Sequence, residues 1–170
     1  MSKVLRFMAL CVMGMFILGS SLVYAEKLGY VDLGKLFDEY NKTKDYDKDL
    51  EAKQKSYEAE RENKVNEIKQ LQDKLDLLAD KEKEAQKKEL DYKIKSLQDF
   101  DRDKTQDLRK QRDERMKEIL KDIESAISQY AKKEGYTLVF NDRVLVYQDK
   151  SLDITDKVLE VLQKMYPSKK

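Results

Sequence analysis

The chain has 170 residues, of which 41% are charged, and it contains no His, no Trp and a single Pro. A composition this polar leaves too few apolar residues to bury in one compact core for the whole chain. Lys and Arg (35) nearly balance Asp and Glu (34), so no general basic field attracts nucleic acid, and strong direct membrane binding is not expected.

Residues 1–25 are predicted to be a cleavable signal peptide. Lys3 and Arg6 precede an apolar run of about ten residues, which is short for a membrane span, and small residues stand at Val23 and Ala25. An uncleaved N-terminal anchor is the alternative, and a lipoprotein attached at Cys11 is a weaker one. Cleavage after Ala25 removes Cys11, the only cysteine, so the exported chain can enter an oxidising compartment without disulfide chemistry.

Residues 26–42 are predicted to form a short strand and a short helix. The strand candidate is KLGYV, and Asp32 is a suitable N-cap for a helix that carries Leu33, Leu36, Phe37 and Tyr40 on one side. Asn41-Lys42-Thr43 reads formally as a glycosylation acceptor, but we expect Asn41 or Thr43 to cap the long helix that follows.

Residues 43–134 contain neither Gly nor Pro and are predicted to be a long antiparallel helical hairpin, a coiled-coil arm. Apolar residues recur at spacings of three, four and seven in two stripes, and the pattern lapses near Asp80. The stripes are Tyr46, Leu50, Tyr57, Val65, Ile68, Leu71, Leu75, Leu78 and then Leu90, Ile94, Leu97, Leu108, Met116, Ile119, Ile123, Ala126, Ile127, Tyr130.

Each stripe contains a stretch poor in apolar residues, 51–64 in the first and 101–114 in the second, and together we call them the waist of the arm. Their positions support a reversal of the chain at Asp80. Residues 51–64 keep one tyrosine and two alanines, residues 101–114 keep one leucine, and reflection about Asp80 superposes these two stretches. Each arm helix would be on the order of 70 Å long at 1.5 Å per residue. A single uninterrupted helix in a parallel oligomer remains the alternative.

Residues 135–170 are predicted to close the hairpin and to complete a small β-containing body with residues 26–42. Gly135 suits the left-handed position after a helix. The runs YTLVF and VLVYQ, joined by a polar NDR turn, indicate a β-hairpin, and Asp153 or Thr155 can cap a last helix that Pro167 ends. The predicted fold class is therefore α+β, mainly α.

This body is too small to hold its own core while it carries a long arm, and its strand edges would be unpaired, so we expect it to oligomerise. The apolar residues predicted at the oligomer interface are Val31, Leu138, Phe140, Val144 and Val146.

No catalytic constellation, metal site or cofactor site is expected, because the exported chain has no His or Cys and no Gly-rich loop follows a strand. The abundant carboxylates fit solvated helix faces paired with Lys and Arg. The candidates for diffuse contact with unfolded apolar chains are Tyr46, Tyr57 and Tyr92 on the arm and Leu75, Leu77 and Leu78 near its tip. Seam packing and closure of the hairpin end explain the same residues equally well.

The two ends of the chain resemble the Skp (OmpH-like) family of periplasmic chaperones. The resemblance rests on KLGYVDLGKLFDEY near the start, and on GYTLVFNDRVLVYQDKSLDITDKVLEVLQKMY at the close. It implies a homotrimer whose β body carries three helical arms around a cavity, and an ATP-independent holdase that binds unfolded outer-membrane proteins there.

The chain departs from the best-known members of that family in being near neutral where they are strongly basic, so binding of lipopolysaccharide or anionic lipid is not carried over. The competing interpretation is a structural coiled-coil spacer or adaptor of the cell envelope.

Overall fold

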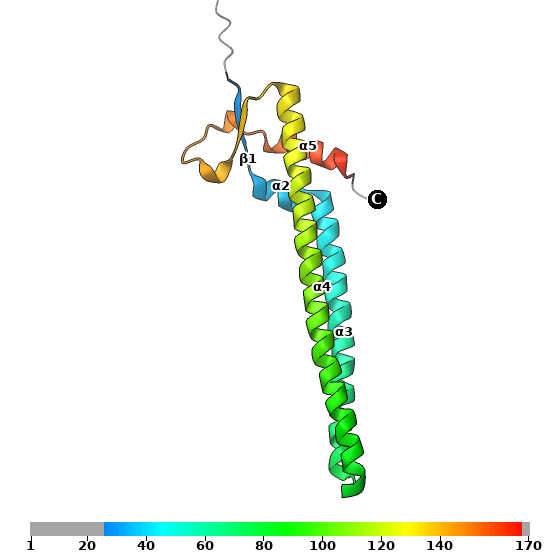
Figure 1. The fold of residues 1–170 in the computed structure, drawn as a ribbon. Coiled ribbons are helices and arrows are strands. Elements are labelled where there is room, and N and C mark those ends of the chain that lie inside the picture. The colour runs from blue at the N-terminus through cyan, green and yellow to red at the C-terminus, as the bar shows by residue number, and fades with distance from the viewer. Residues whose placement is uncertain (1–25, 168–170) are drawn as a thin grey trace, which may run out of the picture.

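The computed structural model describes residues 26–167, which form a small body and one long helical arm that projects from it (Figure 1). The predicted signal peptide, residues 1–25, lies outside the described residues. The elements in chain order are β1 (Leu28–Val31), α2 (Leu33–Glu39), α3 (Asn41–Leu77), α4 (Asp80–Glu134), β2 (Leu138–Asn141), the 3-10 turns η1 (Asp142–Val144) and η2 (Lys150–Leu152), and α5 (Thr155–Met165). The fold is α+β and mainly α, as predicted.

The arm is an antiparallel hairpin of α3 and α4, and its turn falls at Leu78 and Ala79, next to the predicted position. The expected side-chain cap of the first arm helix is wrong, because Tyr40 occupies the cap position and no side chain caps the helix. Tyr40 donates its N–H to Leu36 and accepts from the N–H of Lys44, so α2 leads into α3 with these backbone groups already paired. Thr43 is buried at 2% exposure instead of capping.

The sheet has two parallel strands, with Leu28 opposite Leu138 and Val31 opposite Asn141. The predicted β-hairpin of YTLVF and VLVYQ is therefore wrong. The side chain of Asn141 accepts the N–H of Arg143 at 3.3 Å, and the 3-10 turn that follows directs the chain away from β2. The strand partner of β2 comes instead from the other end of the chain, and the whole arm between them provides the long connection that a parallel pair requires.

The end of α4 matches its sequence signals. Gly135 adopts the left-handed conformation at φ 75° and follows Lys132 and Lys133 in the last helical turn. Lys27 adds a third cation there, because its Nζ donates to the carbonyl of Glu134 at 2.9 Å and lies 4.2 Å from the ring centroid of Tyr136.

The core of the body draws on β1, α2, the last third of α4 and α5. Its buried side chains are Val31, Leu36, Tyr40, Ile119, Ile123, Ala126, Ile154, Val158 and Leu162. The predicted boundaries between body and arm, at 42/43 and 134/135, fall near helix ends. The core of the body nevertheless extends along α4 as far as Ile119. The residues after about 118 thus belong to the body as much as to the arm.

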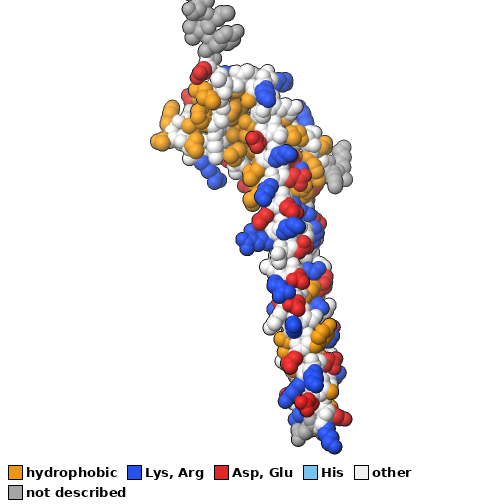
Figure 2. All heavy atoms as spheres, viewed as in Figure 1, with side chains coloured by type: hydrophobic (Ala, Val, Ile, Leu, Met, Phe, Trp, Pro, Cys, Tyr) orange, Lys and Arg blue, Asp and Glu red, His pale blue; other side chains and the backbone are white. Residues whose placement is uncertain are grey.

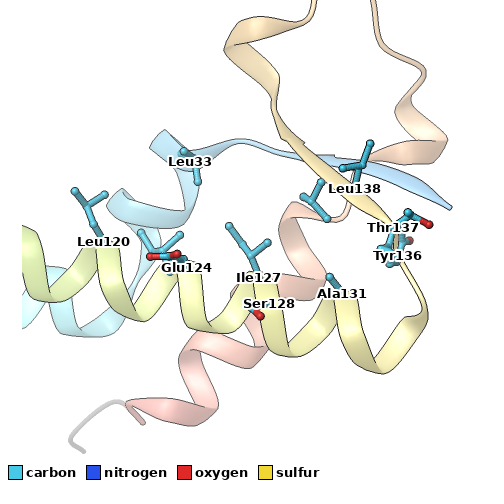
Figure 3. A pocket seen from close by; sticks show the side chains of 11 residues that line it. Leu33, Leu120, Glu124, Ile127, Ser128, Ala131, Tyr136, Thr137 and Leu138 are labelled. Carbon is cyan, nitrogen blue, oxygen red and sulfur yellow. The ribbon is translucent and has the colours of Figure 1, made fainter. Parts of the chain in front are cut away.

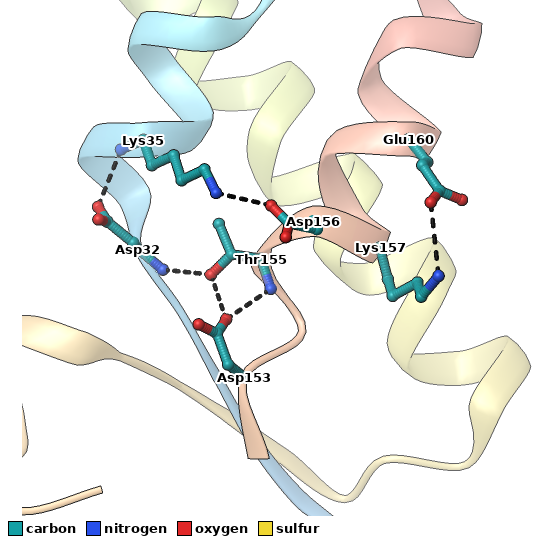
Figure 4. A network of polar contacts seen from close by, with 7 residues as sticks. All are labelled: Asp32, Lys35, Asp153, Thr155, Asp156, Lys157 and Glu160. Carbon is teal, nitrogen blue, oxygen red and sulfur yellow. Dashed lines mark hydrogen bonds and ion pairs between the residues drawn. The ribbon is translucent and has the colours of Figure 1, made fainter. Parts of the chain in front are cut away.

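Polar contacts fix α5 against β1 and α2 (Figure 4). The N–H of Asp32 donates to Oγ1 of Thr155 at 2.9 Å, and Oδ1 of Asp153 accepts the N–H of Thr155 at 2.9 Å. Lys35 pairs with Asp156 at 2.7 Å. Asp153 therefore satisfies the first N–H of α5, although Ile154 stands at the cap position itself. Asp32 caps α2 as predicted, accepting the N–H of Lys35 at 2.8 Å.

Candidate interaction surfaces

The described part of the chain holds no group of three or more His, Cys, Asp or Glu side chains placed to bind a metal ion. The candidate functional regions described below are surfaces. Two regions matter: the arm, whose surface is covered by interspersed acidic and basic side chains, and the body, where apolar side chains gather (Figure 2).

The root of the arm is joined to the body by a cluster of charged and aromatic side chains. Lys42 pairs with Glu118 at 2.6 Å and with Asp122 at 2.8 Å, and only 12% of its side chain is exposed. The hydroxyl of Tyr40 donates to Asp122 at 3.1 Å, and that of Tyr46 donates to Glu118 at 2.7 Å. Helix α3 is thereby tied to α4 at the point where the arm leaves the core.

A second set of contacts lies one turn further along the arm. Arg115 donates to the carbonyl of Tyr46 at 3.1 Å, pairs with Asp49, and lies 4.7 Å from the centroid of the Tyr46 ring. Asp49 also pairs with Lys53 at 3.2 Å. Tyr46 is thus half-buried between the two helices and fixed by both its ring and its hydroxyl.

These contacts shift the pKa values at the arm root. Hydrogen bonds from Lys42 and Tyr46 lower the pKa of Glu118, and those from Arg115 and Lys53 lower that of Asp49. Burial lowers the pKa of Lys42, but its hydrogen bonds to Asp122 and Glu118 outweigh burial, and the net pKa lies above the usual value for lysine.

From these shifts we expect stability to fall in acid. A carboxylate with a lowered pKa stabilises the fold fully above its ordinary value, near 4.5 for Glu118, and loses that contribution as the pH falls through the lowered value. The raised pKa of Lys42 matters at the alkaline end of the pH range, because the contribution of Lys42 to stability is lost only above about pH 10.5. Thermal unfolding followed by circular dichroism should give a constant midpoint from about pH 5 to 10 and a falling one below pH 4.5.

Glu118→Gln is the control for this prediction, because it removes the titrating carboxyl group. The unfolding midpoint of this variant should fall less below pH 4.5 than that of the wild type. If the midpoint of that variant falls as far in acid as that of the wild type, Glu118 does not contribute to the loss of stability.

The waist of the arm is polar, as predicted, but it is bridged rather than empty. The hydroxyl of Tyr57 donates to Asp101 at 3.0 Å, and Arg61 pairs with Asp101 at 3.1 Å. Lys53 donates to Gln111 at 2.6 Å. The sequence stripes missed Phe100, whose ring centroid lies 5.7 Å from that of Tyr57. Phe100 stands three residues after Leu97, a helical spacing that could have placed it in the second stripe.

The six residues predicted to contact unfolded chains lie in different places along the arm. Leu77 at the tip and Tyr92 on α4 are 88% and 70% exposed. Leu75 and Leu78 are half-buried at the hairpin end, and Tyr46 and Tyr57 are half-buried in the seam. The structure does not bring them into one site, and contact with a partner through them stays a proposal.

The residues predicted at the oligomer interface divide into two groups. Val31 is 2% exposed and packs inside the core of its own chain, because both faces of β1 are covered. Leu138, Phe140, Val144 and Val146 have exposed side chains. The sequence analysis missed Tyr147, which is 85% exposed beside them, and Leu120, which is 48% exposed on α4.

A groove of about 430 Å³ separates α4 from β2 (Figure 3). Leu120, Ile123 and Ile127 of α4 line one wall, and Leu138 and Val139 of β2 line another. Glu124 is the one charged residue among those that line it. The groove is thus an apolar surface hollow on the body, outside the closed core.

Among residues 26–167, no helix is both long and apolar enough to cross a membrane.

Comparison with known proteins identifies the same overall architecture. Residues 27–162 match the sequence profile of the family described as "Outer membrane protein (OmpH-like)". No curated protein matches the sequence. Among solved structures, a putative outer membrane chaperone (OmpH-like) from Caulobacter crescentus CB15 superposes with a TM-score of 0.78. The match covers 89% of this chain and 92% of that one at 14% identity, so it shows a common fold.

Proposed function

This chain belongs to the OmpH-like family, and from that premise we propose that it is an ATP-independent holdase, a chaperone that binds unfolded outer-membrane proteins without folding them. The clients would be held in a cavity between the helical arms of a homotrimer. The chaperone named in the structural comparison supports this proposal at the level of the fold.

One observation carries the proposal: a long two-helix arm, with little apolar burial of its own, stands on a small body that leaves apolar surface open. Of the core side chains buried in the described residues, only Ile68 lies in the outer part of the arm; the remaining ones lie in the body. Such an arm contributes little to its own stability and offers a long, weakly binding surface, which suits many weak contacts with an unfolded chain.

The proposed location is the periplasm, to which a signal peptide, residues 1–25, would direct export before it is cleaved after Ala25. The remaining 33 basic and 34 acidic residues give a net charge of −1, so we expect neither nucleic-acid binding nor strong direct membrane binding. The partners are unfolded outer-membrane β-barrel proteins and two further copies of the chain. We expect neither a cofactor nor enzymatic activity.

The test is dilution of a urea-unfolded outer-membrane β-barrel protein into nucleotide-free buffer with and without this protein, followed by light scattering. We expect the protein to keep the barrel soluble without ATP. Aggregation at the same rate with and without the protein would contradict the proposal.

A structural spacer or adaptor of the envelope is the second candidate, and the bridged waist favours it. The contacts of Tyr57 with Phe100 and Asp101, together with the Arg61–Asp101 pair, brace the two helices where the apolar seam is thin. A spacer would bind one folded partner and leave the diluted barrel to aggregate, so the same experiment separates the two functions.

A further inference from the structure

A second apolar hollow lies at the root of the arm, where α2, α3 and α4 come together. Its volume is about 150 Å³. We call it the root hollow, and its apolar walls come from three helices: Phe37 of α2, Tyr46 and Leu50 of α3, and Met116 and Ile119 of α4. An apolar cavity of about 150 Å³ is large enough for one benzene ring, so the root hollow has room for one aromatic side chain.

The walls of the root hollow are held in place by contacts within the chain. The hydroxyl of Tyr46 donates to Glu118 at 2.7 Å, and Arg115 lies 4.7 Å from the centroid of the Tyr46 ring. Ile119 is 3% exposed and belongs to the core of the body. Met116 is 46% exposed, and its unbranched thioether can adjust to a neighbouring ring. A ligand therefore has few side chains to order on binding, which lowers the cost of association.

Charged side chains of both signs also line the root hollow. Arg115 is already paired with Asp49. Asp47 and Arg112 are exposed and make no ion pair or side-chain hydrogen bond with another residue of the range 26–167. The carboxylate of Asp47 can accept a hydrogen bond from a backbone N–H, and the guanidinium of Arg112 can donate to a backbone carbonyl.

This combination matches the chemistry of an unfolded chain. A folded protein buries most of its large aromatic side chains and pairs its backbone N–H and C=O groups within its own structure. An unfolded segment presents an exposed ring together with an unpaired N–H and C=O on the same residue. A lipid tail could enter an apolar hollow, but it carries no polar groups for Asp47 and Arg112.

We propose that the root hollow binds one aromatic side chain of an unfolded client, with Asp47 accepting the N–H and Arg112 donating to the carbonyl of the client backbone beside it. This inference rests on the proposed function for the identity of the client, and adds a site and the class of side chain that enters it. One ring in one hollow does not keep a whole barrel soluble, so the remaining contacts come from the rest of the arm.

Methyl NMR of the full chain, labelled with ¹³C at the methionine methyl groups, tests the site. Met116 and Met165 are the two methionines of the described residues, and Leu substitutions at each assign their signals. The probe is N-acetylphenylalanine N-methylamide, which carries one ring, a backbone N–H and a backbone carbonyl. We expect the Met116 signal to shift and to saturate at millimolar probe, because a ring beside the methyl group changes its shielding. The Met165 signal should stay in place.

N-Acetylglycine N-methylamide is the control ligand, because it has the same backbone groups and no ring. It should move neither signal. Equal shifts of the Met116 and Met165 signals, or equal shifts with the two ligands, would overturn the site. A Met116 signal that moves with the concentration of the protein itself, but not with the probe, would also overturn it, because the occupant would then be another copy of the chain.

Removal of the donor tests the role of Arg112. Arg112→Leu should weaken binding of the probe, followed at the Met116 methyl group, about threefold or more, because the carbonyl of the probe loses its charged donor. Arg109→Leu is the matched control, since Arg109 is also exposed on α4 but does not line the root hollow. Equal binding by the two variants would overturn the role of Arg112.

Filling the root hollow tests its role with a client. Met116→Trp places an indole ring in the hollow, and we expect about threefold or more of this variant to be needed to keep the diluted barrel soluble. Met165→Trp makes the same change at a methionine that is 43% exposed on α5, and it should act as the wild type does. Circular dichroism verifies that the helices of both variants are intact.

The outcomes separate this inference from the proposed function. A wild-type chain that keeps the barrel soluble, together with an equally effective Met116→Trp variant, overturns the root hollow as a client site and leaves the holdase proposal standing. A wild-type chain whose Met116 signal responds to the probe but that fails to keep the barrel soluble overturns the holdase proposal, and the affinity of the hollow for an exposed aromatic residue stands.

Discussion

Replacing Leu36 with alanine is expected to lower the free energy of unfolding by about 2–5 kcal/mol, the usual cost of a Leu-to-Ala cavity in a closed core. Leu36 is fully buried, and its helix α2 packs between α3, α4 and α5. Its side chain joins the two ends of the sequence, so the cavity would affect the whole body. Urea unfolding followed by circular dichroism measures the change.

Leu77→Ala is the matched control, because it removes the same atoms from a side chain that is 88% exposed. Its effect should stay within about 0.5 kcal/mol. Equal effects of the two substitutions would mean that Leu36 is not part of a closed core.

Replacing Lys42 with methionine is expected to lower the free energy of unfolding by about 2–3 kcal/mol, as measured by urea unfolding. Removing one partner of a fully buried ion pair typically costs about 3–5 kcal/mol, and the lower value follows because Glu118 is half exposed and partly screened by solvent. Met keeps most of the apolar stem of lysine but leaves the carboxylates of Glu118 and Asp122 four residues apart on α4 without their shared cation.

The control for this charge effect is Lys55→Met. Lys55 pairs with Glu51 at 2.7 Å, but the two side chains are 72% and 65% exposed. Because both side chains are solvated, the loss of this pair should lower the free energy of unfolding far less than the loss of Lys42 does. If Lys42→Met is equally mild, the arm root is a solvated surface rather than a structural joint.

Much of the architecture could be predicted because its signals are local. The absence of Gly and Pro from residues 43–134, the two apolar stripes and Gly135 together predicted the hairpin and its end. The lapse of the apolar stripes placed the turn near Asp80, the mirror relation between the two polar stretches supported it, and the helix that follows begins there. Asp32 was identified as a cap because capping depends on one side chain and a backbone N–H three residues away.

The errors concern interactions that are not local. VLVYQ has strand propensity, but propensity does not show which strand is the partner, and β2 pairs with β1 from the far end of the chain. Val31 and Leu138 looked equivalent as apolar strand residues, yet β1 is covered on both faces and β2 is not. The contact of Phe100 with Tyr57 was not predicted, because the two rings lie on different helices. Burial of this kind depends on which elements meet, and a single stripe does not specify that.

The central claim is that the arms hold the client, and a short-armed variant tests it most directly. Residues 54–110 are replaced by a short turn containing Asn and Gly, so that the Lys53–Gln111 hydrogen bond becomes the new tip and the Lys42 contacts remain. This variant should keep a folded, self-associating body, as measured by circular dichroism and light scattering. We predict that it fails to keep a urea-unfolded outer-membrane β-barrel soluble on dilution, whereas the full chain succeeds. Equal protection by the two proteins at equal molar concentration would show that the body, and not the arms, binds the client.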